Sequence, residues 1–240
     1  MLGAIGRSDR PHPRQGRRGE ARLPAVAAVL VAIALYALLP ERLLAVPRYV
    51  VPALEILLLI PVIVVNPRRL TRQTRWSRRL SLAVALVIAV ANQVALGLLL
   101  HALLTVTGEQ ARELLLAAGQ VWFTNIIAFG LIFWELDRGG PVARTQGGSR
   151  RELPAADFRF SQDENDDAVE EVAVSASGRA DWVPTLIDYL YVSVTNSTAF
   201  SPTDTMPLST RAKLLMTVES VAALLTSVLV IARAVGALPS

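Results

Sequence analysis

Long apolar runs alternate along this sequence with short blocks of charged residues. The apolar runs occupy residues 23–39, 49–65, 80–107, 114–134, 182–200 and 211–237. An uncharged run of about 20 residues matches the thickness of the hydrocarbon core of a bilayer. The pattern therefore predicts an all-α, polytopic helical membrane protein with about five membrane helices plus a re-entrant or sixth apolar segment.

The charged blocks divide the chain into four parts. Residues 1–22 form a basic tail that we expect to be disordered, and residues 23–136 form a four-helix membrane region. Residues 137–181 form a polar cytoplasmic linker, and residues 182–240 form a pore-like helix hairpin. The tail and the first run together are typical of a signal peptide, but no small-x-small cleavage site follows, so we expect an uncleaved membrane helix.

The run at 182–200 allows two interpretations. It either spans the membrane or forms a re-entrant half-helix whose chain leaves on the side where it entered. The residues that follow it are rich in hydroxyls and include Pro202 and Asp204. These groups favour a half-helix packed inside the protein, because irregular polar backbone at membrane depth must be buried in protein or line a wet cavity.

The charge distribution orients these segments. Only 18% of the residues are charged, and every basic residue except Lys213 is an arginine. The arginines gather in 1–22, 66–79 and 137–181, which fall on one side of a membrane if the first four runs each cross it. The positive-inside rule then places the N-terminus in the cytoplasm, and we expect a protein of the bacterial plasma (inner) membrane with the lipid bilayer as its partner. Topology accounts for the basic charge, so we expect no nucleic-acid binding.

The sequence shows no recognised catalytic motif. There are no cysteines, the two histidines are His12 and His101, and no metal-binding, nucleophile or phosphate-binding motif occurs. We therefore expect no catalytic residue, no cofactor and no bound metal. The acidic run 163–171 lacks the glycine and the final acid of a calcium loop, which favours a solvated linker.

Ionisable side chains in the last apolar run are the strongest candidates for function. Glu219, Thr226 and Arg233 follow one another at seven-residue steps, so they share roughly one face of a helix. Such a stripe either lines a path for an ion or a substrate, or it pairs with a neighbouring helix.

Polar residues also interrupt the earlier runs. Asn92 and Gln93 in the third run and Asn125 in the fourth favour hydrogen bonds between helices, while His101 is also a candidate proton relay. Glu55 in the second run either packs against a neighbour or belongs to a pathway.

Two sequence segments carry a family resemblance. They are D-Y-L-Y-V-S-V-T-N-S-T-A-F-S-P-T-D at 188–204, followed by S-T-R-A at 209–212, and F-W-E-L-D-R-G-G-P at 133–141. Over residues 110–238 the chain resembles a bacterial family of multi-spanning membrane proteins, domain of unknown function 1345. The resemblance implies a multi-spanning helical fold and assigns no activity.

The first of these segments is also similar to the two-helix pore module of potassium channels. The spacing of tyrosine, hydroxyl and acidic residues matches that module at Tyr191, Ser193, Thr195, Thr198 and Asp204. However, no glycine or tyrosine stands between Thr198 and Asp204. A potassium filter aims successive carbonyls at one axis, which requires left-handed conformations that glycine visits freely. The resemblance therefore implies a degenerate pore-like hairpin, a homo-oligomer that is a tetramer if a pore forms, and no potassium-selective filter.

Two functions stay open. One is a channel or transporter-like conduit without potassium selectivity, and the other is a non-conducting membrane scaffold or partner protein. The candidate pathway residues are Glu219, Thr226, Arg233, Asp188, Thr198 and Asp204.

Overall fold

The computed structural model describes residues 19–72, 74–105, 111–147, 153–164, 168–199 and 204–236. Its main helices are α1 (Leu23–Ala37), α2 (Val50–Val65), α3 (Arg75–Thr105), α4 (Ala111–Leu136), α8 (Leu186–Ala199) and α9 (Thr210–Gly236). They coincide with the six predicted runs to within a few residues, so the prediction of a mostly helical fold is confirmed. The short elements are η1 (Glu41–Leu43), η2 (Asp137–Gly139), α5 (Pro141–Gln146), β1 (Phe158–Arg159), η4 (Ser161–Asp163), α6 (Glu170–Ala173), α7 (Ser177–Ala180) and β2 (Met206–Pro207).

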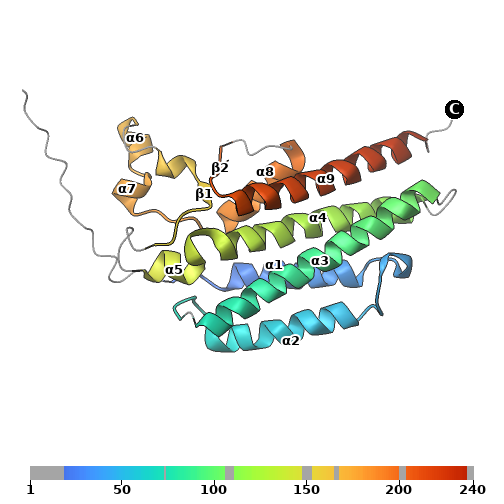
Figure 1. Ribbon diagram of the computed structural model, residues 1–240, viewed down its shortest axis with the longest axis horizontal. Coiled ribbons are helices and arrows are strands. Elements are labelled where there is room, and N and C mark those ends of the chain that lie inside the picture. Colours follow the sequence, from blue (N-terminus) through green and yellow to red (C-terminus); the bar gives the residue numbers. More distant parts are fainter. Residues whose placement is uncertain are drawn as a thin grey trace, which may run out of the picture.

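The long helices lie side by side, with α4 at the centre of the bundle (Figure 1). It contacts α1, α3, α8 and α9. In the described part of the chain, three helical segments are long and apolar enough to cross a membrane: Arg75–Thr105, Glu113–Gly139 and Thr210–Arg233. The apolar helices α1 and α2 are shorter.

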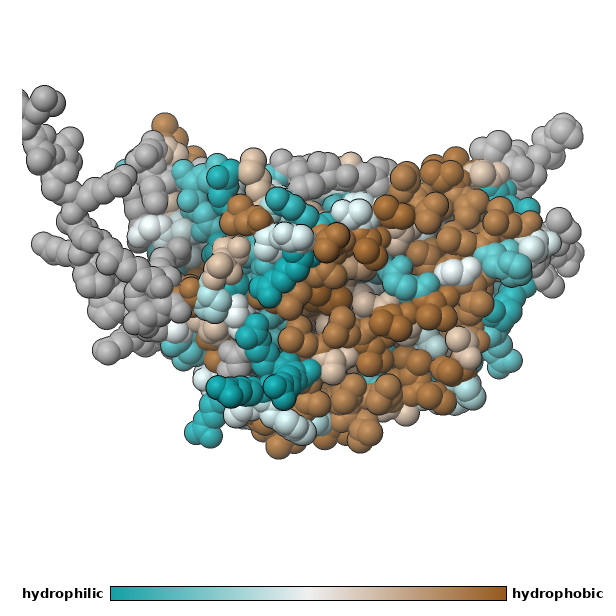
Figure 2. All heavy atoms as spheres, viewed as in Figure 1, coloured by the Kyte–Doolittle hydropathy of each residue, from teal (hydrophilic) through white to brown (hydrophobic). Residues whose placement is uncertain are grey.

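The outer surface of the bundle is strongly apolar. On the face shown in Figure 2, brown side chains form a broad band with hydrophilic residues at both ends. Large aliphatic residues such as Leu57, Leu104 and Ile231 are more than 60% exposed. Soluble monomers rarely leave so wide an apolar area open to water, so this surface is suited to contact with lipid.

The packing of α4 against α8 depends on a small residue. A Cβ atom on Gly130 would lie 2.7 Å from Cδ2 and 3.3 Å from Cα of Leu190. The two helix backbones approach closely at this point because glycine leaves room, as is common between helices in membranes.

The chain reverses sharply at the end of α4. Arg138, Gly139 and Gly140 have φ angles of 50°, 83° and 96°, a region that glycine visits without steric cost. Arg138 is held there by hydrogen bonds from its guanidinium to the Phe158 carbonyl, at 3.2 Å, and to the Asp163 carboxylate, at 2.6 Å. The turn leads directly into α5.

The segment 137–181, which we predicted to be a polar linker, is anchored to the bundle by aromatic side chains. Phe158 and Phe160 are buried in the same core as Phe133 and Tyr189, with ring centroids 5.1 to 6.5 Å apart. The expectation rested on the polar composition of the segment, which did not reveal these two aromatic anchors. Of its acidic run, Glu170 and Glu171 are exposed, and residues 165–167 lie outside the described residues.

The last residues of the predicted disordered tail are also anchored. The backbone amide of Leu70 donates to the carbonyl of Glu20 at 3.0 Å, and Ala21 forms a bridge with Arg69. The Glu20 carboxylate accepts from the Trp134 indole at 3.0 Å and from the Leu186 amide at 2.7 Å. Burial raises the pKa of Glu20, although these two hydrogen bonds oppose the rise. The remainder of the tail, 1–18, lies outside the described residues.

One end of the bundle collects the described basic segments. Residues 19–22 pair with 68–70, and Asn66, Ser77 and Pro141 line one crevice. We call this end, formed by residues 19–22, 66–79 and α5, the arginine end.

The helix α8 begins near the arginine end, and the chain that follows α8 comes back to the same end. Its first residue, Leu186, is bonded to Glu20, and β2 pairs with β1 through Met206 with Arg159 and Pro207 with Phe158. The helix has 14 residues, which gives it a length of about 21 Å. It therefore reaches only part of the way along its neighbours.

Candidate functional site

A fully buried carboxyl lies between α8 and α9. Glu219 of α9 has no exposed surface. The Asn196 side-chain amide donates to its Oε2 at 2.6 Å, and the Ser197 hydroxyl donates to its Oε1 at 3.2 Å. The Ser193 hydroxyl also contacts Oε1 and lies 2.9 Å from the carbonyl of Ile126 in α4. Three helices thus enclose the group.

The sequence of α8 explains why these partners converge. Ser193, Asn196 and Ser197 are spaced at three and four residues, so they lie on one face of the helix. They are buried with Leu186, Tyr189 and Val192, while Ile187 and Tyr191 on the opposite side are exposed. The buried face is therefore aromatic and aliphatic near its start and polar near its end.

The amide of Asn196 fixes this arrangement. Its nitrogen donates to Glu219 and, at 3.0 Å, to the Met216 carbonyl, which uses both amide protons. Its oxygen accepts from the Ser220 hydroxyl at 2.8 Å. Asn196 is therefore held in one orientation, with a donor aimed at the carboxyl.

The contact between Ser193 and Glu219 permits two proton arrangements. A hydroxyl carries a single proton and two acceptor lone pairs. If Ser193 donates to Glu219, the carboxyl accepts as an anion. If Ser193 donates to the Ile126 carbonyl, a protonated Glu219 donates to the serine oxygen. The geometry accommodates both forms of the carboxyl with little movement.

The partners of Glu219 among the described residues are all neutral. Within the described residues no arginine, lysine or histidine forms an ion pair with it. Its contact Ser197 is two residues from the C-terminal end of α8, where the helix dipole is negative. A buried carboxylate without a positively charged partner is costly, so this site favours a bound proton or a bound cation.

Polar groups continue along the same face of α9. Thr226 is buried two turns beyond Glu219 and lines a narrow crevice with Asn92 and Asn125. Asn92 and Gln93 of α3 donate to Oδ1 of Asn125 at 3.3 and 2.9 Å. The predicted hydrogen bonds between the third and fourth runs are thus present. His101 is exposed, outside this cluster.

The other candidate pathway residues lie elsewhere. Asp188 caps the start of α8, where its Oδ2 accepts from the amide and hydroxyl of Thr185 at 2.7 and 2.9 Å. Thr198 is exposed and donates to the Val194 carbonyl at 2.8 Å. Asp204 is exposed and Arg233 is half-buried near the end of α9. The structure therefore brings only Glu219 and Thr226 into the interior.

Sequence reasoning missed Asn196 and Ser197 as partners of Glu219. Their spacing from Ser193 on one helical face was the available signal. The residues that correspond to a potassium filter, 200–203, lie outside the described residues.

No family model, no curated protein and no solved structure matches this chain.

Proposed function

We propose that this chain is an integral membrane protein that carries protons or monovalent cations through the site at Glu219. In this proposal α1, α2, α3, α4 and α9 cross the bilayer, and α8 is a re-entrant half-helix. The length of α3, α4 and α9 and the apolar outer surface support the placement in a membrane. We also propose that the chain is related to the multi-spanning membrane family that residues 133–141 and 188–204 resemble, which agrees with a location in the membrane.

The observation that carries the proposal is the buried Glu219 with neutral partners only. The residue lies nine positions after the start of α9, a depth of about 14 Å along the helix axis. This is close to the middle of a hydrocarbon core about 30 Å thick. Ionisable groups at that depth are expensive and usually belong to ion or proton pathways, and half-helix C-terminal ends commonly coordinate Na⁺ or H⁺ in transporters.

The positive-inside rule supplies the orientation. The arginine end gathers segments 19–22 and 66–79 with α5 (Figure 1), and such segments favour the cytoplasmic side. We therefore propose a bacterial plasma membrane protein with a cytoplasmic N-terminus.

One observation favours the alternative of a non-conducting scaffold. Both oxygens of the Glu219 carboxyl have hydrogen-bond partners, which are Ser193, Asn196 and Ser197. A satisfied buried network rigidifies a core and specifies its packing. A scaffold uses Glu219 to fix α8 against α9, whereas a conduit requires the carboxyl to exchange its proton or cation.

A flux assay separates the two functions. The protein is reconstituted into liposomes that contain a pH-sensitive dye, a proton gradient is applied, and the voltage is clamped with potassium and valinomycin. We expect acidification with the unmodified protein and only the rate of empty liposomes with Glu219→Gln. Glu55→Gln is the matched control, because Glu55 is also a buried acid but lies in α2, away from α8 and α9.

The outcomes are distinct. Equal flux with Glu219→Gln and Glu55→Gln would place the pathway elsewhere, and no flux with the unmodified protein would leave the scaffold function. Sodium and potassium gradients are tested separately in planar bilayers without valinomycin, because valinomycin itself conducts potassium selectively. A reversal potential that follows potassium and strongly excludes sodium would refute the expected absence of a potassium-selective filter.

A further inference from the structure

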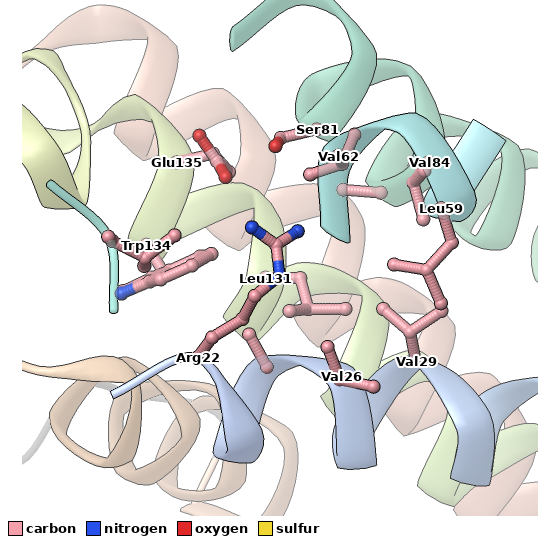
Figure 3. A pocket seen from close by; sticks show the side chains of 13 residues that line it. Arg22, Val26, Val29, Leu59, Val62, Ser81, Val84, Leu131, Trp134 and Glu135 are labelled. Carbon is pink, nitrogen blue, oxygen red and sulfur yellow. The ribbon is translucent and has the colours of Figure 1, made fainter. Parts of the chain in front are cut away.

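A second internal feature lies at the arginine end, between α1, α2, α3 and α4. It is a narrow cavity with an apolar body and a charged end (Figure 3). The apolar body is lined by Val26, Val29, Leu59, Val62, Val84 and Leu131. None of these residues belongs to the site at Glu219.

Arg22, Ser81 and Glu135 form the charged end. The guanidinium of Arg22 points into the cavity toward Glu135, and the Ser81 hydroxyl faces the Glu135 carboxyl (Figure 3). Arg22 and Glu135 are each only 5% exposed. Arg22 donates to the Asn66 carbonyl at 3.2 Å, but its Nε has no partner within the described residues. The buried Nε of Arg22 is therefore an unused donor beside this space.

The cavity continues into a crevice that leads toward α5. Arg22, Val62, Ser81 and Glu135 line both spaces, and the crevice adds Arg72 and Arg78. The Nε of Arg78 is likewise buried and unpaired in the described part of the chain. Three arginines and one acid therefore line the two spaces, which leaves an excess of positive charge beside the apolar body of the cavity.

We propose that this site binds an anionic amphiphile, with a phosphate or carboxylate head group at Arg22 and Arg78. The cavity of about 40 Å³ takes only the first carbons of the alkyl chain, and the rest of the chain leaves between α1 and α2 toward the apolar outer surface. Guanidinium groups bind such anions through paired, charge-assisted hydrogen bonds. The excess charge selects an anion, and the valine and leucine lining selects an alkyl chain. Glu135 balances Arg22 while the site is empty. The proposal is independent of any flux through Glu219.

Binding of dodecyl phosphate to the full chain in dodecyl maltoside tests the proposal. The measurement is native mass spectrometry together with the ligand-induced rise in melting temperature. We expect saturable binding to the unmodified protein and binding weakened about tenfold or more in Arg78→Gln, since one charge-assisted hydrogen bond is lost. Arg79→Gln is the matched control, because Arg79 is the next residue of α3 and is exposed. Inorganic phosphate alone should bind far more weakly than dodecyl phosphate.

A second variant tests the alkyl part of the site. Ala85→Leu fills the cavity next to Val84 and should weaken dodecyl phosphate without removing any charge. If that variant does not fold, Arg78→Gln and Arg79→Gln still decide the question. Equal affinity in these two arginine variants, or equal binding of inorganic phosphate and dodecyl phosphate, would overturn the proposal.

The same native mass spectra distinguish a ligand that comes from the bilayer from one that comes from solution. Phosphatidylglycerol that copurifies with the unmodified protein but not with Ala85→Leu supports the proposal with the bilayer as the source. Binding of added dodecyl phosphate to protein free of copurified phospholipid supports it with a soluble amphiphile as the source.

Discussion

The hydroxyl of Tyr189 donates a hydrogen bond of 2.5 Å to the Asp137 carboxylate, and it thereby joins α8 to the turn that ends α4. The second oxygen of Asp137 accepts from the backbone amide of Asp157 at 2.6 Å. Both Tyr189 and Asp137 are fully buried. One carboxylate therefore connects the turn after α4, the segment that leads into β1, and α8. These bonds fix the position of the first turns of α8 relative to the end of α4.

Removal of the Tyr189 hydroxyl should destabilise the protein. Tyr189→Phe keeps the ring beneath the Arg144 guanidinium, which lies 4.9 Å from the ring centroid, but leaves one oxygen of Asp137 without its donor. We expect a loss of about 1–3 kcal/mol, the usual cost of a buried unsatisfied polar group. Chemical unfolding in detergent measures it. Tyr191→Phe on the exposed side of α8 is the control, and equal losses in both variants would contradict this role for Asp137.

Gly130 should tolerate substitution poorly. A valine at this position would force α4 away from Leu190 of α8, and overpacking of this kind typically costs about 1–3 kcal/mol. A Cβ atom on Gly119 in the same helix would meet no atom within 4 Å, so Gly119→Val is the control. Thermal melting of both variants compares them. A smaller effect at Gly130 than at Gly119 would argue against close packing of α4 and α8.

Asp163 should make stability depend on pH. Partial burial acts to raise the pKa of Asp163, but the Arg138 guanidinium, the Ser177 hydroxyl and the Phe160 amide together hold it below its usual value. Since the pKa is lower in the folded protein than in the unfolded chain, the stabilisation is complete above the ordinary value of 3.8 and is lost as the pH falls through the lowered value.

The variant Asp163→Asn checks this expectation. It should be less stable than the unmodified protein at pH 7, by about 1–3 kcal/mol, and the difference should shrink as the solution becomes strongly acidic. Unfolding at a series of pH values gives the result. Glu171→Gln, at an exposed position of α6, is the control. A difference that stays constant down to strongly acidic pH would show that the charge of Asp163 is not involved.

Single cysteines should report the orientation of the bundle. The chain has no cysteine of its own, so each introduced thiol is unique. Thr71→Cys and Glu171→Cys, both exposed and outside the apolar helices, should resist an impermeant thiol reagent added to intact cells. Tyr49→Cys, at a position that is 74% exposed at the opposite end of the bundle, should react. Labelling of Thr71→Cys from outside would reverse the proposed topology.

The helices were predictable from the sequence because each one is a long apolar run with charged residues at its ends. Glu219 was also predictable, since an acid inside such a run is conspicuous, and Thr226 followed from the helical repeat. The partners of Glu219 were harder to identify, because serine and asparagine are common on any helix and only their common face distinguishes them.

The contacts at the arginine end could not be predicted from the pattern of apolar and polar residues. Glu20 bonds to Leu186 across 166 positions, and Phe158 and Phe160 occur within a polar segment that resembles a solvated connection. A charged residue in a linker has the same local pattern whether it is solvated or paired. Only the fold decides which arginine meets which acid.

The return of the chain after α8 to the arginine end has a consequence for the two ends of the chain. If α8 enters and leaves on one side, the proposed membrane helices cross the bilayer an odd number of times. The N-terminal segment and the end of α9 then face opposite compartments, and a reporter fused after α9 is exported. A spanning α8 would make the number even and keep both ends inside the cell. In the proposed topology, the pairing of the two short strands β1 and β2 thus keeps the start of α9 on the side of the membrane where α8 begins.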